Sequence, residues 1–404
     1  MHDNSRSSSQ LNPFLLPQEE VLEKQNKRKQ LRIGLIKEQD ESETRVPITP
    51  EGVNQLVDMG HDVLVEKDTG IGCRFSPKDY AEAGAFICEE KGKVFDADIL
   101  LKISPLNKVE VDLLRHGQTL FTSLNLATRN EAYFRSLMQK KTTAIAFELI
   151  QDEYGEYPVL RSMCEIAGTF SVGIGSRYLS HENHGKGILL GGITGVTPTE
   201  VLILGAGTAA EYAARTAIGM GALVKVFDND IRRLQTLKHR IGNEVFTSVL
   251  HPPVLKKAFE TADLVISSLQ RMRLSSFYLV PEDMVMAMKK GSVIVDMHID
   301  QGSSFETGRM TSTKDPVYRE HGVIHYMVPN MTAQVGRTAS IAFSNVLLPL
   351  LTDEARCGGI KQQVKENVGV RNSLYMFNGI LTQEFIGNHF GIPYKDLDLL
   401  LAAF

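Results

Sequence analysis

The stretch from Val201 to Asp228 (VLILGAGTAAEYAARTAIGMGALVKVFD) limits the possible folds more than any other part of the chain. It begins with four apolar residues, Val201–Leu204, a run typical of a strand buried on both faces of a parallel sheet. A glycine turn follows, then a segment of helical composition and a second apolar run that ends in Asp228. This order predicts a βαβ unit in which two parallel strands are joined by a crossover helix.

The turn in this unit has the spacing of a dinucleotide-binding fingerprint. Gly205 permits a tight turn, Gly207 lets a pyrophosphate approach the backbone, and Ala210 lets the helix pack closely on the strand. The helix expected from Thr208 directs its free N–H groups and partial positive charge at the phosphates. Asp228 stands where a carboxylate binds the ribose hydroxyls and repels a 2′-phosphate, which favours NAD as the cofactor.

Length and composition indicate an ordinary globular protein. At 404 residues the chain is too long for one typical domain, so we expect two. The net charge of −4 shows no basic excess and argues against nucleic acid or acidic membranes as partners. Four scattered cysteines with no CxxC pair indicate reduced thiols, and no metal is expected. Without a visible signal peptide or bilayer-length apolar tract, a cytoplasmic protein with no membrane contact is predicted.

Apolar runs bounded by turn signals recur along most of the chain. Strands are expected at 31–36, 61–66, 98–103, 118–122 and 143–147, and again at 201–204, 223–227, 263–267, 292–296 and 323–328. A long helix is expected after Met163, and the tail from about Thr338 is helical in pattern. The predicted fold class is therefore α/β, with two doubly wound Rossmann-like domains and a cleft at the carboxyl ends of their strands.

The strand pattern also predicts how the chain is divided. Residues 1–30 form a polar tail with a short charged helix, VLEKQNKRKQ. Residues 31–160 together with 337–404 form a substrate domain, in which the C-terminal helices return to cover the first sheet. Residues 161–336 form the NAD-binding domain. Within the latter domain, the loop SHENHGKG carries His181 and His184 but no third candidate ligand, so an exposed polar loop is favoured over a metal site.

The chain resembles the alanine dehydrogenases and the related nicotinamide nucleotide transhydrogenase α-subunits over nearly its whole length from Leu31. The matching stretches are RVPITPEGV, LRHGQTLFTSLNLA, AFELIQ, MCEIAG, GAGTAA, VDMHIDQG and VPNM. The resemblance implies NAD-linked oxidative deamination of L-alanine to pyruvate and ammonia. The small-molecule partners would be an amino acid and a 2-oxo acid, and the protein would be a homo-oligomer, either a hexamer or a dimer.

The resemblance also assigns roles to individual residues. Arg45 matches the family's carboxylate-binding arginine. The alternative is a surface arginine paired with Glu41 or Glu43, and the motif favours the ligand role. Asp300 matches an active-site aspartate near the nicotinamide, although an aspartate after a strand is also a common turn residue. Cys164, Leu269 and Asn330 fall at positions that contact the cofactor, with Cys164 replacing a serine of the family.

Two positions depart from the family's alanine enzymes. A substrate-contacting lysine is replaced by Ser104, and the catalytic histidine is replaced by Asn125, which cannot accept a proton near neutral pH. Lys102 lies two residues before Ser104 on the same strand face, so we expect its ammonium to reach the vacated place. His298, two residues before Asp300, is a candidate for the missing imidazole, with a packed core histidine as the alternative.

The residues of the cofactor site therefore match those of the family, whereas the residues for proton transfer do not. Three functions stay open. The first is an NAD-dependent amino-acid dehydrogenase acting on L-alanine. The second is a saccharopine- or carboxyethylornithine-type oxidoreductase of the same superfamily, because an altered pocket suits an altered substrate. The third is a non-catalytic NAD-binding subunit, as in transhydrogenase.

Overall fold

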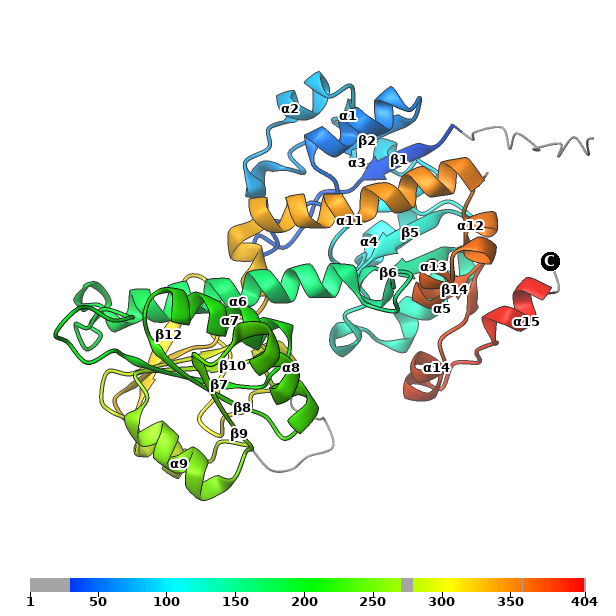
Figure 1. Ribbon diagram of the computed structural model, residues 1–404. Coiled ribbons are helices and arrows are strands. Elements are labelled where there is room, and N and C mark those ends of the chain that lie inside the picture. Colours follow the sequence, from blue (N-terminus) through cyan, green and yellow to red (C-terminus); the bar gives the residue numbers. More distant parts are fainter. Residues whose placement is uncertain (1–29, 270–278, 358, 403–404) are drawn as a thin grey trace, which may run out of the picture.

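The chain folds around two mainly parallel sheets that are joined by long helices. The computed structural model describes residues 30–269, 279–357 and 359–402. Helices α6 (Pro158–Leu179) and α11 (Gly336–Cys357) lie side by side between the two sheets (Figure 1). The charged helix predicted in residues 1–30 lies outside the described residues.

The first sheet has eight strands in the order β15-β14-β6-β5-β4-β1-β2-β3. Six of them are parallel, and β14 and β15 run antiparallel at one edge. In register, Ile33 lies between Val63 and Ile99. The strands are β1 (Arg32–Leu35), β2 (Asp62–Glu66), β3 (Phe86–Cys88), β4 (Ile99–Leu101), β5 (Thr119–Thr122), β6 (Thr143–Ala146), β14 (Leu374–Phe377) and β15 (Ile380–Leu381).

The second sheet has seven strands in the order β12-β13-β11-β10-β7-β8-β9, with only β12 antiparallel. The strands are β7 (Glu200–Leu204), β8 (Leu223–Phe227), β9 (Val245–Ser248), β10 (Leu264–Ser267), β11 (Val293–Asp296), β12 (Val317–Glu320) and β13 (Val323–Tyr326). In both sheets the six parallel strands follow the 3-2-1-4-5-6 order of a doubly wound fold, with the order reversing beside the first strand. The predicted fold class is thereby confirmed.

The remaining helices connect the strands and cover the sheets. They are α1 (Pro50–Asp58), α2 (Pro77–Glu82), α3 (Lys91–Val94), α4 (Lys108–Leu113), α5 (Glu131–Gln139), α7 (Thr208–Gly219), α8 (Ile231–Ile241), α9 (Pro252–Thr261), α10 (Glu282–Met286), α12 (Ile360–Glu366), α13 (Val368–Ser373), α14 (Glu384–Phe390) and α15 (Leu397–Ala402). Helix α4 begins with a capping box between Asn107 and Glu110. None of the helices in the described part of the chain is long and apolar enough to cross a bilayer.

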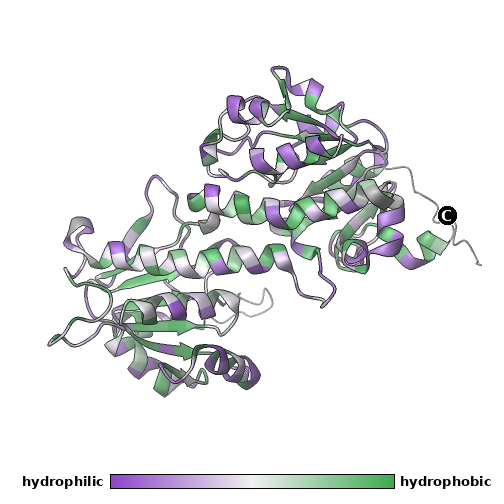
Figure 2. Ribbon diagram, turned by 45° about the horizontal axis from the view of Figure 1, so that its top comes forward, coloured by the Kyte–Doolittle hydropathy of each residue, from purple (hydrophilic) through white to green (hydrophobic). Residues whose placement is uncertain are grey.

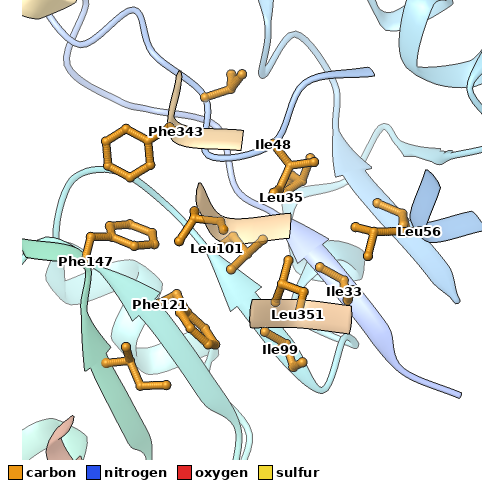
Figure 3. Close-up of a cluster of buried hydrophobic side chains, with 14 of the residues drawn as sticks. Ile33, Leu35, Ile48, Leu56, Ile99, Leu101, Phe121, Phe147, Phe343 and Leu351 are labelled. Atoms are coloured by element: carbon orange, nitrogen blue, oxygen red, sulfur yellow. The ribbon is translucent and has the colours of Figure 1, made fainter. Parts of the chain in front are cut away.

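Each sheet separates two hydrophobic layers, because successive side chains of a buried strand point to opposite faces. On one face of the first sheet, Leu101 and Phe121 pack with Phe147 and with Phe343 of α11 (Figure 3). On the other face, Leu100 packs beneath α3, α4 and α5. Figure 2 shows the same distribution, with hydrophobic strands and with hydrophilic residues on the helices. The C-terminal return to the first sheet is therefore part of the main core.

The C-terminal tail differs from the helical pattern expected for it. Leu374–Phe377 forms β14, which pairs with β6, and Ile380–Leu381 forms β15. Strand β14 is a fully buried apolar run of four residues, and periodicity cannot tell such a run from a buried piece of helix. Strands β3, β9 and β12 were also missed, because each has only three or four residues and partly exposed positions.

The long helix predicted after Met163 is confirmed as α6, and a glycine controls its packing. A Cβ atom built on Gly168 would lie 2.1 Å from the backbone oxygen of Ala209 in α7. The two helix backbones can approach this closely only because Gly168 has no side chain. Farther along α6, Gly173 faces open space, since nothing lies within 4 Å of the corresponding Cβ position.

This difference gives a matched pair of substitutions on one helix. We expect Gly168→Ala to destabilise the protein by about 1–3 kcal/mol, because the added methyl group forces α6 and α7 apart. We expect Gly173→Ala to stabilise it by about 0.5–1 kcal/mol, because alanine is the better helix former. Urea denaturation of the two variants and the parent protein measures both changes, and equal effects would contradict the close contact.

Candidate functional site

The glycine turn between β7 and α7 lies at the point where the strand order of the second sheet reverses. Gly205 has a φ of 99°, and a Cβ atom there would lie 2.4 Å from the Ser268 hydroxyl after β10. Gly207 is the N-cap of α7 and faces open space. No side chain caps the first turn of α7, which leaves its N–H groups free for an anionic ligand. The turn has the features that a dinucleotide pyrophosphate requires.

Four other predicted cofactor residues lie beside this turn, in α7, or in α6, which packs on α7. Ala210, in the first turn of α7, is fully buried, while Thr208 at the start of the same helix is half-buried. Leu269, two residues past β10, lies with its side chain about 3.3 Å from the Cβ position of Gly205. Cys164 of α6 packs half-buried against the same hydrophobic core, and burial raises the pKa of its thiol, so this residue offers a neutral surface.

Asp228 directly follows β8 and is buried. One carboxylate oxygen accepts the N–H of Ala206 at 2.8 Å, and the other accepts the N–H of Asp230 at 2.8 Å. Each oxygen keeps a further lone pair, so a ribose hydroxyl can still donate to it. The nearby Arg232 and Arg233 lie against Asp230 instead, at 3.6 and 4.0 Å. This arrangement suits a ribose without a 2′-phosphate.

Arg45 is buried in a network that joins the first sheet to the segment after β13. Its guanidinium makes two parallel bonds to Glu43, at 2.7 and 2.6 Å, and donates to the Thr332 hydroxyl at 2.9 Å. The Asn330 amide donates to the same Glu43 carboxylate at 2.8 Å. The pairing with a glutamate therefore exists, but it lies inside the protein: the side chains of Arg45 and Glu43 are only 11% and 5% exposed. Glu43 was considered from the sequence only as a surface partner.

Lys102 directly follows β4, and its ammonium lies within the first domain. It donates to Glu110 of α4 at 2.8 Å, and its side chain is 3% exposed. Glu110 also accepts from Lys91 at 2.9 Å. Glu38 is the next carboxylate, at 4.0 Å from the Lys102 ammonium. The expected reach of Lys102 toward the place next to Ser104 stays a prediction, because in this structure its charge is matched by Glu110.

Ser104 and Asn125, the two departures from the family, each lie in a loop held by a buried glutamate. Glu38 accepts the N–H groups of Ile103 and Ser104 through one oxygen, at 2.8 and 3.1 Å. Glu148 accepts the N–H groups of Leu124 and Asn125 through one oxygen, at 2.7 and 3.4 Å. In both glutamates the second oxygen is buried without a hydrogen-bond partner.

These two glutamates could have been suspected from the sequence, because each follows an apolar strand as a ligand-facing residue does in α/β folds. Burial raises the pKa of Glu38 to about 7 and also raises the pKa of Glu148. Asn125 itself has a left-handed backbone, with φ 39° and ψ 57°, and an exposed side chain. Asparagine adopts this conformation more readily than most residues.

His298 and Asp300 follow β11 in a short 3₁₀ turn, η6 (Ile299–Gln301). Asp300 is exposed and His298 is half-buried. Burial lowers the pKa of His298, and the nearby Asp300 carboxylate opposes this effect, so the imidazole is mainly neutral at pH 7. The backbone N–H of His298 donates to the buried Asp296 at 3.0 Å. The proton-accepting role considered for His298 stays a prediction.

All the predicted site residues except Cys164, Thr208 and Ala210 lie in the segments that follow the carboxyl ends of strands. Hydrogen bonds bring Arg45 and Asn330 together through Glu43. Packing brings Gly205 and Leu269 together. No hydrogen bond in the described residues joins Lys102, Asn125 and His298 to one another. The histidine loop contains a short helix, η5 (His181–Asn183), and no metal-binding cluster of three candidate ligands occurs within the described ranges.

Fold and site together define a class of protein: a two-sheet α/β protein with a dinucleotide fingerprint at the switch point of its second sheet. Two family models match the chain, the N-terminal domain of alanine dehydrogenase/PNT over residues 34–167 and the C-terminal domain over residues 171–384. The chain therefore belongs to the alanine dehydrogenase/PNT family, as the sequence resemblance indicated.

Similar proteins agree with this assignment. An alanine dehydrogenase of Methanococcus maripaludis is 41% identical over 371 residues, which cover 91% of this chain and 99% of that protein. An alanine dehydrogenase of Staphylococcus haemolyticus is 39% identical over 372 residues, covering 91% and 98%. Among solved structures, an L-alanine dehydrogenase superposes with a TM-score of 0.82 and 35% identity, over 89% of this chain and 98% of that one. A transhydrogenase from Sinorhizobium meliloti, at 22% identity and a TM-score of 0.74, shares the fold.

The open space at Gly207 gives a test of the dinucleotide turn. We expect Gly207→Val to leave the melting temperature unchanged within about 2 °C, since no protein atom lies within 4 Å of the Cβ position. It should raise the dissociation constant for NADH at least about tenfold, because the side chain fills the space through which a pyrophosphate approaches the backbone. Gly219→Val, at the other end of α7 and also facing open space, is the control. Unchanged NADH affinity in a fluorescence titration of Gly207→Val would contradict this assignment.

Proposed function

We propose that this protein is an NAD-dependent amino-acid dehydrogenase that converts L-alanine, NAD and water to pyruvate, ammonia and NADH. The observation that carries the proposal is the buried network of Arg45, Glu43 and Asn330. It places a guanidinium suited to a carboxylate next to the segment after β13 of the dinucleotide-binding sheet. The names of the similar enzymes of M. maripaludis and S. haemolyticus support the same reaction.

In the proposed reaction Arg45 orients the substrate carboxylate, which requires Glu43 to share the guanidinium or to shift aside. NAD, when bound, supplies the hydride acceptor for the substrate Cα, and the N–H groups of α7 and the Asp228 carboxylate hold it. Asp300, with His298 or Asn125, orients the water that attacks the resulting imine. Lys102 supports the pocket through its positive charge. These roles require ordered groups that lose little entropy on binding, and the buried Arg45 network has this property.

The domain roles and the assembly belong to the same proposal. Residues 31–160 and 337–404 would bind the substrate, and residues 161–336 would bind NAD. A cytoplasmic homo-oligomer, a hexamer or a dimer, is proposed in addition. The apolar side chains of Leu189, Ile193 and Val196 support a subunit contact, because they are 62%, 59% and 62% exposed.

A second function is favoured by the buried carboxylates near the proposed substrate site. Glu38 and Glu43 lie close enough for Glu43 to raise the pKa of Glu38, and the Glu38 oxygen without a hydrogen-bond partner suits a substrate with an additional ammonium group. An oxidoreductase of the saccharopine or carboxyethylornithine type, which joins a 2-oxo acid to the amine of ornithine or lysine, meets this description. A non-catalytic NAD-binding subunit is the third candidate.

The first experiment is the rise in NADH absorbance when the purified protein is mixed with NAD and L-alanine, followed by the reverse reaction with pyruvate and ammonium. Turnover in both directions is expected. Turnover only with ornithine or lysine and a 2-oxo acid would establish the second function. NADH binding without turnover of any amino acid would establish the third.

Arg45→Lys tests the carboxylate site without leaving Glu43 unpaired, since lysine keeps the positive charge. We expect the KM for L-alanine to rise about 10- to 100-fold, because lysine cannot make two parallel bonds to a carboxylate. The dissociation constant for NADH should not change. Arg135→Lys is the control, because Arg135 makes a similar pair with Glu131 on the exposed surface of α5. An unaltered KM in Arg45→Lys would remove Arg45 from the substrate site.

A further inference from the structure

Glu38 has a buried carboxylate oxygen without a hydrogen-bond partner in the described residues. The residue lies three positions past β1, at the carboxyl edge of the first sheet. Its Oε1 accepts the N–H groups of Ile103 and Ser104, whereas its Oε2 is buried without a hydrogen-bond partner. A buried carboxylate oxygen without a donor costs free energy, so its presence in a native protein requires an explanation, and a ligand that supplies the donor is one.

The charges around Glu38 are already matched by other groups. The Lys102 ammonium is 4.0 Å from Oε2, but Lys102 makes its direct bond to Glu110. Glu43 is the other nearby carboxylate, and both of its oxygens bond to the guanidinium of Arg45. Burial and Glu43 raise the pKa of Glu38, Lys102 lowers it, and the result is a pKa of about 7. Glu38 can therefore both take up and release a proton near neutral pH.

The position of Glu38 relates it to the other candidate substrate residues. The loop that follows β1 carries both Glu38 and Arg45. Through its bond to the N–H of Ser104, Glu38 also contacts the loop after β4. The backbone oxygen of Ser104 accepts from Thr122 at the end of β5, three residues before Asn125. Glu38 thus lies on the loop that carries the guanidinium and contacts the loop of Ser104, which is in turn bonded to the end of the strand that precedes Asn125.

Glu148 has a similar free oxygen but different surroundings. Burial raises the pKa of Tyr375 in the core beside α5, and the nearby charge of Glu148 raises it further, so Glu148 lies close to this core. The Tyr133 and Tyr375 hydroxyls also lack hydrogen-bond partners there. Glu148 therefore serves to position the Asn125 loop, and Glu38 is the carboxylate associated with Arg45.

We propose that Glu38 is a catalytic residue whose Oε2 contacts the substrate nitrogen and accepts the protons that Asn125 cannot accept. This inference rests on the proposed amino-acid dehydrogenase function and adds a residue to it. It assigns to Glu38 the part that an imidazole at position 125 would otherwise have.

The proton transfers balance over the reaction. Glu38 takes one proton from the substrate ammonium and releases it to solvent; the neutral amine then loses hydride from Cα to NAD, giving an iminium. Water forms a bond to the iminium carbon, its proton passes to Glu38, and the C=N electron pair moves to nitrogen. Glu38 returns that proton to the nitrogen. The C–N bond then breaks with its electron pair on nitrogen, and the hydroxyl proton passes through Glu38 to the departing ammonia as the C=O bond forms.

The test uses Glu38→Gln in the full-length protein. Glutamine keeps one oxygen for the N–H groups of Ile103 and Ser104 but replaces Oε2 with an amide nitrogen that cannot accept a proton. We expect kcat for L-alanine oxidation to fall by about 10²- to 10⁴-fold, the usual contribution of general base catalysis. In the parent protein kcat should fall as the pH drops below about 7, where Glu38 is protonated, and this dependence should be absent from the variant. NADH affinity should not change.

Glu66→Gln is the matched control. Glu66 follows the same pattern at the end of β2: it is buried, it accepts the N–H of Lys37 at 2.9 Å, and burial raises its pKa. Its variant should keep the parent kcat and pH profile. Glu38→Asp retains an ionisable carboxyl one methylene farther back, so it should show a reduced rate but keep a pH-dependent decline. This second variant gives a readout if Glu38→Gln does not fold.

The possible outcomes separate this inference from the proposed function. Turnover in the parent protein with an unchanged rate and pH profile in Glu38→Gln overturns the role of Glu38 and leaves the dehydrogenase function intact. If His298→Ala loses the pH-dependent decline and Glu38→Gln keeps it, the proton is assigned to His298. That result also overturns the role of Glu38. Absence of turnover with any amino acid in the parent protein overturns both proposals.

Discussion

The contact between α6 and α7 is the constraint on which the arrangement of this protein depends. Gly168 lets the two helix backbones touch, so that α6 is held against the dinucleotide-binding fold along its second half. The first half of the same helix carries Met163, whose sulfur lies 3.6 Å from the Arg45 guanidinium. A single rigid helix therefore connects the packing of the second sheet with the candidate substrate residues of the first (Figure 1).

The cofactor side and the substrate side of the candidate site use different kinds of chemical groups. On the cofactor side, small residues and free N–H groups leave room for a ligand, and Asp228 uses its carboxylate to hold the turn in place. On the substrate side, buried charges are paired over short distances, as in Arg45 with Glu43 and Lys102 with Glu110. Breaking either pair would leave an uncompensated buried charge, which is costly, so these side chains are held in defined positions.

Buried glutamates hold the backbone at the two positions that depart from the family. Ser104 and Asn125 contribute no charge, yet the loops that carry them are fixed by Glu38 and Glu148 through pairs of backbone hydrogen bonds. Thr122 joins these loops to each other by donating to the Ser104 carbonyl. The replaced side chains therefore change the chemistry of the pocket while the backbone around them stays supported.

Much of the fold and several site residues could be predicted from the order of residues along the chain. The run from Val201 to Asp228 predicted the strand, turn, helix and strand that form the switch point of the second sheet, because glycine spacing and apolar runs act locally. The family resemblance identified Arg45, and its possible glutamate partner was visible two residues away. The positions of the predicted site residues after the ends of strands likewise followed from the α/β pattern.

Only the tertiary structure decided which groups meet. Strand β14 is a buried apolar run whose state is set by its partner β6, more than two hundred residues earlier in the chain. The ammonium of Lys102 bonds to Glu110 of α4, a partner eight residues farther along the chain that the strand pattern did not indicate. One Glu38 oxygen accepts two N–H groups from another loop, whereas the other oxygen has no hydrogen-bond partner in the described residues. Such features depend on contacts between distant segments, which local patterns of sequence do not encode.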